Sequence, residues 1–163
     1  MSGKFAQTTD VPVEKSRMEI ERTLQRYGAT SFAYGTQDDT ATIAFRIEER
    51  YIRFTLKMPA RTERRFTHFK HGSGQYLPRT SSAAEAQWEQ GCRSSWRALA
   101  LVIKAKLEAV AAGITTVEDE FLAHTMLPDG TTFGEWARPQ IDQSYRVGGM
   151  PKLLMIGGPA DAH

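Results

Sequence analysis

Cysteine is scarce in this sequence, and its scarcity excludes several classes of protein. Cys92 is the single cysteine among 163 residues, so the chain can form no internal disulfide and no cysteine-rich zinc site. Folds that depend on disulfide staples or on a cysteine-rich zinc site are therefore excluded. Because Cys92 falls within a helical pattern, we expect it to be a small, buried, structural thiol.

Long apolar runs are also missing. No stretch approaches the roughly 20 apolar residues of a membrane-spanning helix. The N-terminal sequence MSGKFAQTTDVPVEK contains no apolar segment of the kind found in signal peptides. A composition of 40% hydrophobic and 25% charged residues is typical of a folded, soluble protein rather than a disordered one. We therefore expect a cytoplasmic protein with one domain of ordinary size.

Enzyme motifs are the third absence. The phosphate-binding pattern GxxxxGK[ST] is missing, and the GSG at 72–74 lacks the strand-turn-helix context of a dinucleotide site. His68 and His71 lie three residues apart, but no carboxylate or cysteine nearby completes a metal site, and the neighbouring charges repel a cation. Glu118–Glu120 could hold a divalent ion, although acids at a helix N-terminus are expected for the helix dipole alone. We expect no enzymatic activity, no metal and no cofactor, and a metal-dependent nuclease is the alternative.

Positive charge is present, but it is concentrated in one place. The formal net charge is +2. The stretch RTERRFTHFKHGSGQYLPRT, at 61–80, has five basic residues and one acid, which contributes +4 and leaves −2 for the remainder. A local excess of this kind is typical of a patch that faces a polyanion.

Hydrophobic periodicity predicts a helix followed by three strands. Apolar residues recur on one helical face of 13–27, and Gly28 follows in the position of a C-terminal cap. Alternation of apolar and polar residues then predicts strands at 31–34, 41–49 and 50–58. Only a tight polar segment separates the two longer strands, so we expect them to form an antiparallel hairpin.

The longest periodic segment, 84–112, predicts a helix that lies across the sheet. Its apolar stripe consists of Trp88, Cys92, Trp96, Leu99, Ile103, Leu107 and Val110. A short helix to about His124 should follow, with Phe121 and Leu122 inward. A last helix should begin at a capping box of Thr132 and Glu135. Its apolar residues are Trp136, Ile141 and Tyr145.

These elements predict one α+β domain over residues 1–157. A three-stranded antiparallel meander would pack against the long helix, with the N-terminal helix alongside and a helical C-terminal extension. A long basic loop at 60–82 would join the sheet to the long helix. Residues 158–163 would form a mobile tail.

The basic loop is the candidate functional site. A connection of about twenty residues without periodicity is longer than most and is often functional or disordered. Arginine and lysine contact phosphates, and aromatic rings stack on unpaired bases with roughly 1–3 kcal/mol per base. This combination favours single-stranded nucleic acid, because a duplex hides its base faces. The candidate residues are Arg61, Arg64, Arg65, Phe66, Phe69, Lys70, Tyr76 and Arg79, extended by Arg53 and Lys57 on the polar face of the preceding strand.

A structural alternative is equally compatible with the same stretch. Phe66, Phe69 and Tyr76 could pin the loop to the core while the charges are merely solvated. The exposure of these three rings decides between the two interpretations.

Three segments resemble an uncharacterised family of phage and prophage proteins. They are VPVEKSRMEIERTLQRYGATSFAYG at 11–35, WRALALVIKAKLEAVAAGITTVEDEFLAHTMLPDG at 96–130, and GGMPKLL at 148–154. The resemblance implies an accessory role in an early or DNA-metabolism region, and it supplies no catalytic residues.

Together with the basic loop, the resemblance predicts a non-enzymatic phage-type accessory protein. Such a protein would bind single-stranded nucleic acid, DNA rather than RNA, during recombination or replication in the cytoplasm of a bacterial host. Formation of a homo-oligomer is left open. The alternative is an anti-defence, anti-CRISPR-like inhibitor that binds a host protein or a ribonucleoprotein complex.

Overall fold

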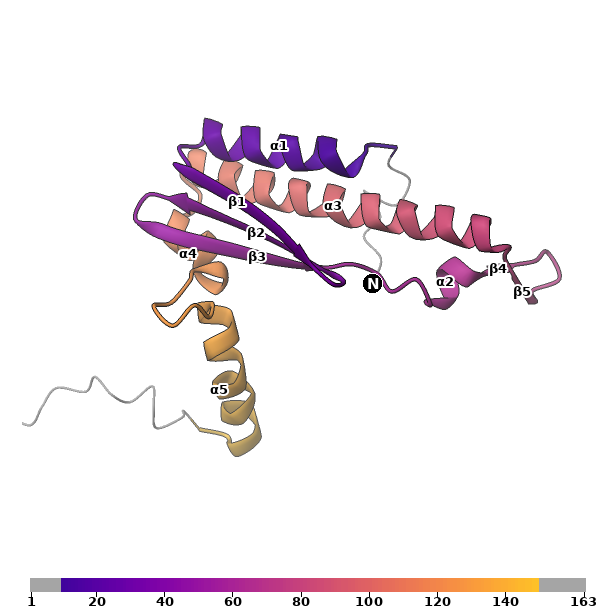
Figure 1. Cartoon of the computed structure of the whole chain (residues 1–163). Helices are drawn as coiled ribbons and strands as arrows, with labels where there is room; N and C mark the ends of the chain where they lie inside the picture. The colour runs from indigo at the N-terminus through magenta and orange to yellow at the C-terminus, as the bar shows by residue number, and fades with distance from the viewer. Residues whose placement is uncertain (1–9, 150–163) are drawn as a thin grey trace, which may run out of the picture.

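A three-stranded antiparallel sheet and two long helices form the body of the protein (Figure 1). The structure, a computed structural model, describes residues 10–149. Chain order in the sheet is also spatial order, and the strands are β1 (Ser31–Gln37), β2 (Thr40–Ile47) and β3 (Arg50–Lys57). Helices α1 (Val13–Arg26) and α3 (Ser81–Ala111) lie side by side against this sheet. The predicted α+β meander on a long helix is confirmed.

The register of the strands explains which side chains enter the core. In β2, alternate residues are buried, and cross-strand pairing sets Ile43 opposite Phe54 and Phe45 opposite Ile52. Residues that face one another across strands project to the same side. That side meets the apolar stripe of α3, of which Trp96 and Ile103 are buried members.

The C-terminal third begins at α4 (Val117–Phe121), continues through the 3₁₀ helix η1 (Leu122–His124), and ends with α5 (Phe133–Val147). The predicted capping box is confirmed, since Thr132 and Glu135 bond each other's backbone in both directions. Phe121 is buried as predicted, but Leu122 is 48% exposed. The prediction that Leu122 faces inward was wrong. Helix α4 ends at Phe121, and the tighter 3₁₀ turn that follows points the Leu122 side chain outward.

The last helix exists as predicted, but the three apolar residues that indicated it do not reach the core. Helix α5 extends away from the body (Figure 1), and Trp136, Ile141 and Tyr145 are all exposed. None of the helices within residues 10–149 is long and apolar enough to cross a membrane. The tail at 158–163, expected to be mobile, lies outside the described residues.

The stretch expected to be one irregular loop at 60–82 is folded. It contains the short helix α2 (Arg64–Thr67) and a two-stranded hairpin of β4 (His68–Lys70) and β5 (Tyr76–Pro78). A turn closes the hairpin, with the His71 N–H donating to the Gln75 carbonyl at 2.7 Å and Gly74 at φ +86°. The expectation of a loop was wrong because strands of three residues are too short to show alternation.

Candidate nucleic-acid interface

The segment between β3 and the hairpin is docked on the first half of α3. The Trp88 indole N–H donates to the Pro59 carbonyl at 2.8 Å. The Arg61 guanidinium lies 3.5 Å from the centre of the Trp88 ring and forms an ion pair with Glu85. Arg61 therefore attaches this segment to α3, and its charge is matched by a carboxylate.

Phe66 is the second anchor, and its predicted role in stacking on bases is wrong. The side chain is 4% exposed and faces Gly91 of α3. A Cβ atom at Gly91 would lie 2.7 Å from the Cζ atom of the Phe66 ring, so the glycine makes room for the ring. A ring held in this way cannot reach a nucleic-acid base.

Arg65 is exposed, but an acid neutralises it. Its Nε lies 2.7 Å from a carboxylate oxygen of Glu63, and its guanidinium lies 4.5 Å from the centre of the Phe66 ring. The ion pair offsets the charge that Arg65 would present to a polyanion. The single acid in this stretch thus lowers the positive field near α2.

The other five candidates of the 61–80 stretch gather on or beside the β4–β5 hairpin. Phe69 is 36% exposed and Tyr76 is 52% exposed. The guanidinium of Arg64 lies 4.5 Å from the centre of the Tyr76 ring, and that of Arg79 lies 5.5 Å from the centre of the Phe69 ring. Exposed rings beside cations are what the nucleic-acid interpretation requires.

The hairpin cations lack the acidic partners that the anchoring arginines have. Among residues 10–149, no carboxylate forms an ion pair with Arg64, Lys70 or Arg79. Arg64 and Lys70 are exposed and Arg79 is half-buried, so none of these three positive charges is offset by a paired acid. We call Arg64, Phe69, Lys70, Tyr76 and Arg79 the hairpin surface.

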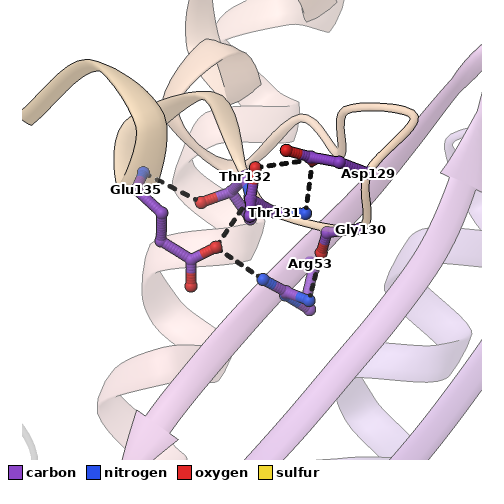
Figure 2. A network of polar contacts seen from close by, with 6 residues as sticks. All are labelled: Arg53, Asp129, Gly130, Thr131, Thr132 and Glu135. Atoms are coloured by element: carbon purple, nitrogen blue, oxygen red, sulfur yellow. Dashed lines mark hydrogen bonds and ion pairs between the residues drawn. The ribbon is translucent and has the colours of Figure 1, made fainter.

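Arg53 does not extend this surface, because it is bonded to the start of α5 (Figure 2). Its guanidinium donates to the Gly130 carbonyl at 2.8 Å and to Oε2 of Glu135 at 2.6 Å. The Thr132 N–H donates to the same oxygen at 2.7 Å. These contacts hold the pKa of Glu135 below its usual value, chiefly through the Thr132 N–H. Arg53 thus links β3 to α5, which lies away from the hairpin (Figure 1).

Lys57 is likewise not brought to the hairpin surface. Its Nζ lies 4.0 Å from a carboxylate oxygen of Asp39 in the turn between β1 and β2. Both side chains are largely exposed, so this pairing is weak. The structure thus gathers five of the ten predicted residues on or beside one hairpin and places the other five in anchoring or paired roles.

The histidines and the acidic cluster occupy structural positions. His68 Nδ1 lies 2.9 Å from the Thr67 hydroxyl, and His71 lies in the turn of the hairpin. Asp119 accepts a hydrogen bond from the Thr116 hydroxyl, and Glu120 pairs with Lys106 at 3.0 Å. In the described part of the chain, no group of three or more His, Cys, Asp or Glu side chains is arranged to hold a metal ion.

From the sequence we did not predict that the first half of α3 holds the segment between β3 and the hairpin. Trp88 was assigned to the core stripe, yet it is partly buried and holds Pro59 and Arg61 instead. One sequence signal could have indicated the contact between Phe66 and α3. A glycine inside a long helical pattern often marks a place where another group approaches closely, and Gly91 is such a residue.

Comparison of the chain with protein-family models, curated proteins and solved structures found no match. The resemblance to phage and prophage proteins therefore stays a prediction. What supports a function is the chemistry of the hairpin surface itself.

Proposed function

We propose that this chain binds single-stranded nucleic acid through the hairpin surface, as a non-enzymatic accessory protein. The observation that carries the proposal is the pairing of exposed rings with unmatched cations on one projecting hairpin. Tyr76 lies beside Arg64, Phe69 lies beside Arg79, and Lys70 stands opposite Tyr76 in the neighbouring strand.

Both parts of this chemistry are needed to favour a single strand. Cations bind phosphates of any nucleic acid by releasing counterions. Exposed rings add stacking, worth roughly 1–3 kcal/mol per base, and only unpaired bases offer their faces. The phage resemblance favours DNA over RNA, in recombination or replication. An oligomer would multiply the number of hairpins on one strand.

A salt-titrated binding assay tests the proposal. Fluorescence anisotropy of a labelled deoxythymidine oligonucleotide of about 20 nucleotides would measure affinity, since that length exceeds most single binding sites. In the double variant Lys70→Ala/Arg79→Ala, the plot of log K against log salt should become shallower by about 1.4, because two phosphate contacts are lost. The matched control, Arg22→Ala/Arg26→Ala, removes the same charge from an exposed face of α1 and should keep the wild-type slope.

Two results would contradict the proposal. If both double variants weaken binding equally, then net charge rather than the hairpin surface is responsible. If the wild-type protein ignores the oligonucleotide even at low salt, the protein does not bind single strands. Capture of one defined host complex by that same protein would then favour the anti-defence inhibitor.

A further inference from the structure

The β4–β5 hairpin has two faces, and each carries its own ring and its own arginine. Phe69 pairs with Leu77 across the strands, and Lys70 pairs with Tyr76. Since successive residues of a strand point to opposite sides, Phe69 and Tyr76 lie on opposite faces of the hairpin. We call these the Phe69 face, with Arg79, and the Tyr76 face, with Arg64 and Lys70.

Neither face is covered by the body of the protein. Every residue from 69 to 78 is exposed. The hairpin projects past the N-terminal end of α3 (Figure 1), and the N–H of Arg79 donates to the Thr67 carbonyl at 2.7 Å where the hairpin joins α2. A ligand can therefore reach both faces of the hairpin at the same time.

The thickness of the hairpin limits what such a ligand can be. Sheets that pack face to face lie about 10 Å apart, so two rings on opposite faces of one hairpin stand on the order of 10 Å apart. Bases in a continuous stack are only about 3.4 Å apart. Two bases that stack on Phe69 and on Tyr76 therefore cannot be neighbours in an unbroken stack.

Stacking is already interrupted where a duplex opens into single strands. Insertion into the interior of a duplex must unstack the base pairs at each step that it enters, whereas insertion at an opening avoids this cost. Phosphates also run along both sides of such an opening, where the cations of the two faces would meet them.

We propose that the hairpin inserts at junctions between double-stranded and single-stranded nucleic acid, with the Phe69 face against one side of the opening and the Tyr76 face against the other. This inference rests on the proposed function and adds the shape of the substrate. It requires both rings to stack at once, whereas a plain single strand needs only one stacked ring beside the cations.

Binding of three DNA probes of equal total length tests the inference. They are a forked duplex, a single strand and a blunt duplex, measured by anisotropy at about 0.15 M salt, where long-range attraction is screened. The wild-type protein should bind the fork at least about tenfold more tightly than the single strand, as one additional stacked base supplies. 2-Aminopurine placed at the fork should change in fluorescence on binding.

Variants that remove one ring at a time measure the contribution of each face to binding. Phe69→Ala and Tyr76→Ala should each reduce fork affinity to the level of the single strand. Tyr51→Ala is the matched control, because Tyr51 is 58% exposed on β3 and also lies beside an arginine, Arg46, at 5.7 Å. This control should keep the preference. None of the three rings belongs to the hydrophobic core, so thermal unfolding should change little and would confirm that the variants fold.

The outcomes distinguish this inference from the proposed function. If the fork and the single strand bind equally, or if only one of the two rings matters, the inference is wrong while the proposed function stands. If no DNA probe binds, both are wrong. A fork preference that either ring variant removes, and that Tyr51→Ala keeps, supports the inference.

Discussion

Replacing Gly91 by alanine should destabilise this protein, although the same change in the interior of most helices is stabilising. Alanine is favoured over glycine inside a helix by about 1 kcal/mol. At this position, however, the new Cβ would lie 2.7 Å and 2.9 Å from two ring atoms of Phe66 and 3.4 Å from the Cγ atom of Pro59. Non-bonded carbon atoms prefer about 3.5–4.0 Å, so the first two contacts overlap by about 1 Å.

The size of the effect follows from two opposing contributions. Because Phe66 is 4% exposed, its ring cannot move aside without disturbing its neighbours. Overpacking of this kind costs about 1–3 kcal/mol, which over most of that range exceeds the gain in helix propensity. In a Phe66→Ala background the obstacle is gone, and Gly91→Ala should then stabilise by up to about 1 kcal/mol. The sign of the effect should therefore reverse.

Urea unfolding of four proteins measures this reversal. They are the wild type, each single variant, and the double variant, and the coupling free energy should be at least about 1 kcal/mol. Ala105→Gly changes an exposed position of the same helix, so it measures the difference in helix propensity between alanine and glycine without any effect of packing. The reasoning is refuted if Gly91→Ala stabilises the wild type as much as Ala105→Gly destabilises it. Phe66 would then not occupy the space beside Gly91, and the anchoring of the hairpin would be wrong.

Two further predictions concern pH. The Thr132 N–H, with a smaller contribution from Arg53, lowers the pKa of Glu135, so its stabilising effect is present above the ordinary glutamate pKa and is lost as pH falls through the folded value. Between about pH 7 and pH 3.5, the urea midpoint of Glu135→Gln should thus fall less than that of the wild type, and an equal fall would contradict this. Burial, and secondly Lys106, lower the pKa of His124 below 6.5, so stability should decrease as pH drops below that value, and this decrease should be smaller in His124→Gln. An NMR titration midpoint for His124 at or above 6.5 would refute it.

Elements with long, regular patterns could be predicted from the sequence. Strands β2 and β3 alternate over eight residues each, so their facing residues had to share one buried side. The stripe of α3 repeats over 31 residues, and the Thr132–Glu135 capping box is a local chemical signal. In these places, local pattern and tertiary packing favour the same answer.

The site could be predicted only in part, because its parts depend on distant contacts. Phe66, Phe69 and Tyr76 look alike in sequence, yet only Phe66 has a glycine of α3 to pack against. The pairing of Arg61 with Glu85, likewise, joins residues that no local pattern connects. Which of the three rings is buried depends on the residue that packs against it in the fold. A single sequence does not show which distant residues come into contact.

The division between anchoring and displayed residues has an energetic consequence for binding. A free loop of about twenty residues would lose about 1–2 kcal/mol of conformational entropy for each residue that its ligand ordered. Here Arg61 and Phe66 already fix the segment on α3, and the hairpin hydrogen bonds fix the rest. Three cations and two rings are therefore held at set spacings before any ligand arrives, and preorganised groups bind more tightly than the same groups on a flexible chain. Because carboxylates offset the charges of Arg61 and Arg65, the positive charge of this segment that has no acidic partner is concentrated on the two faces of the hairpin.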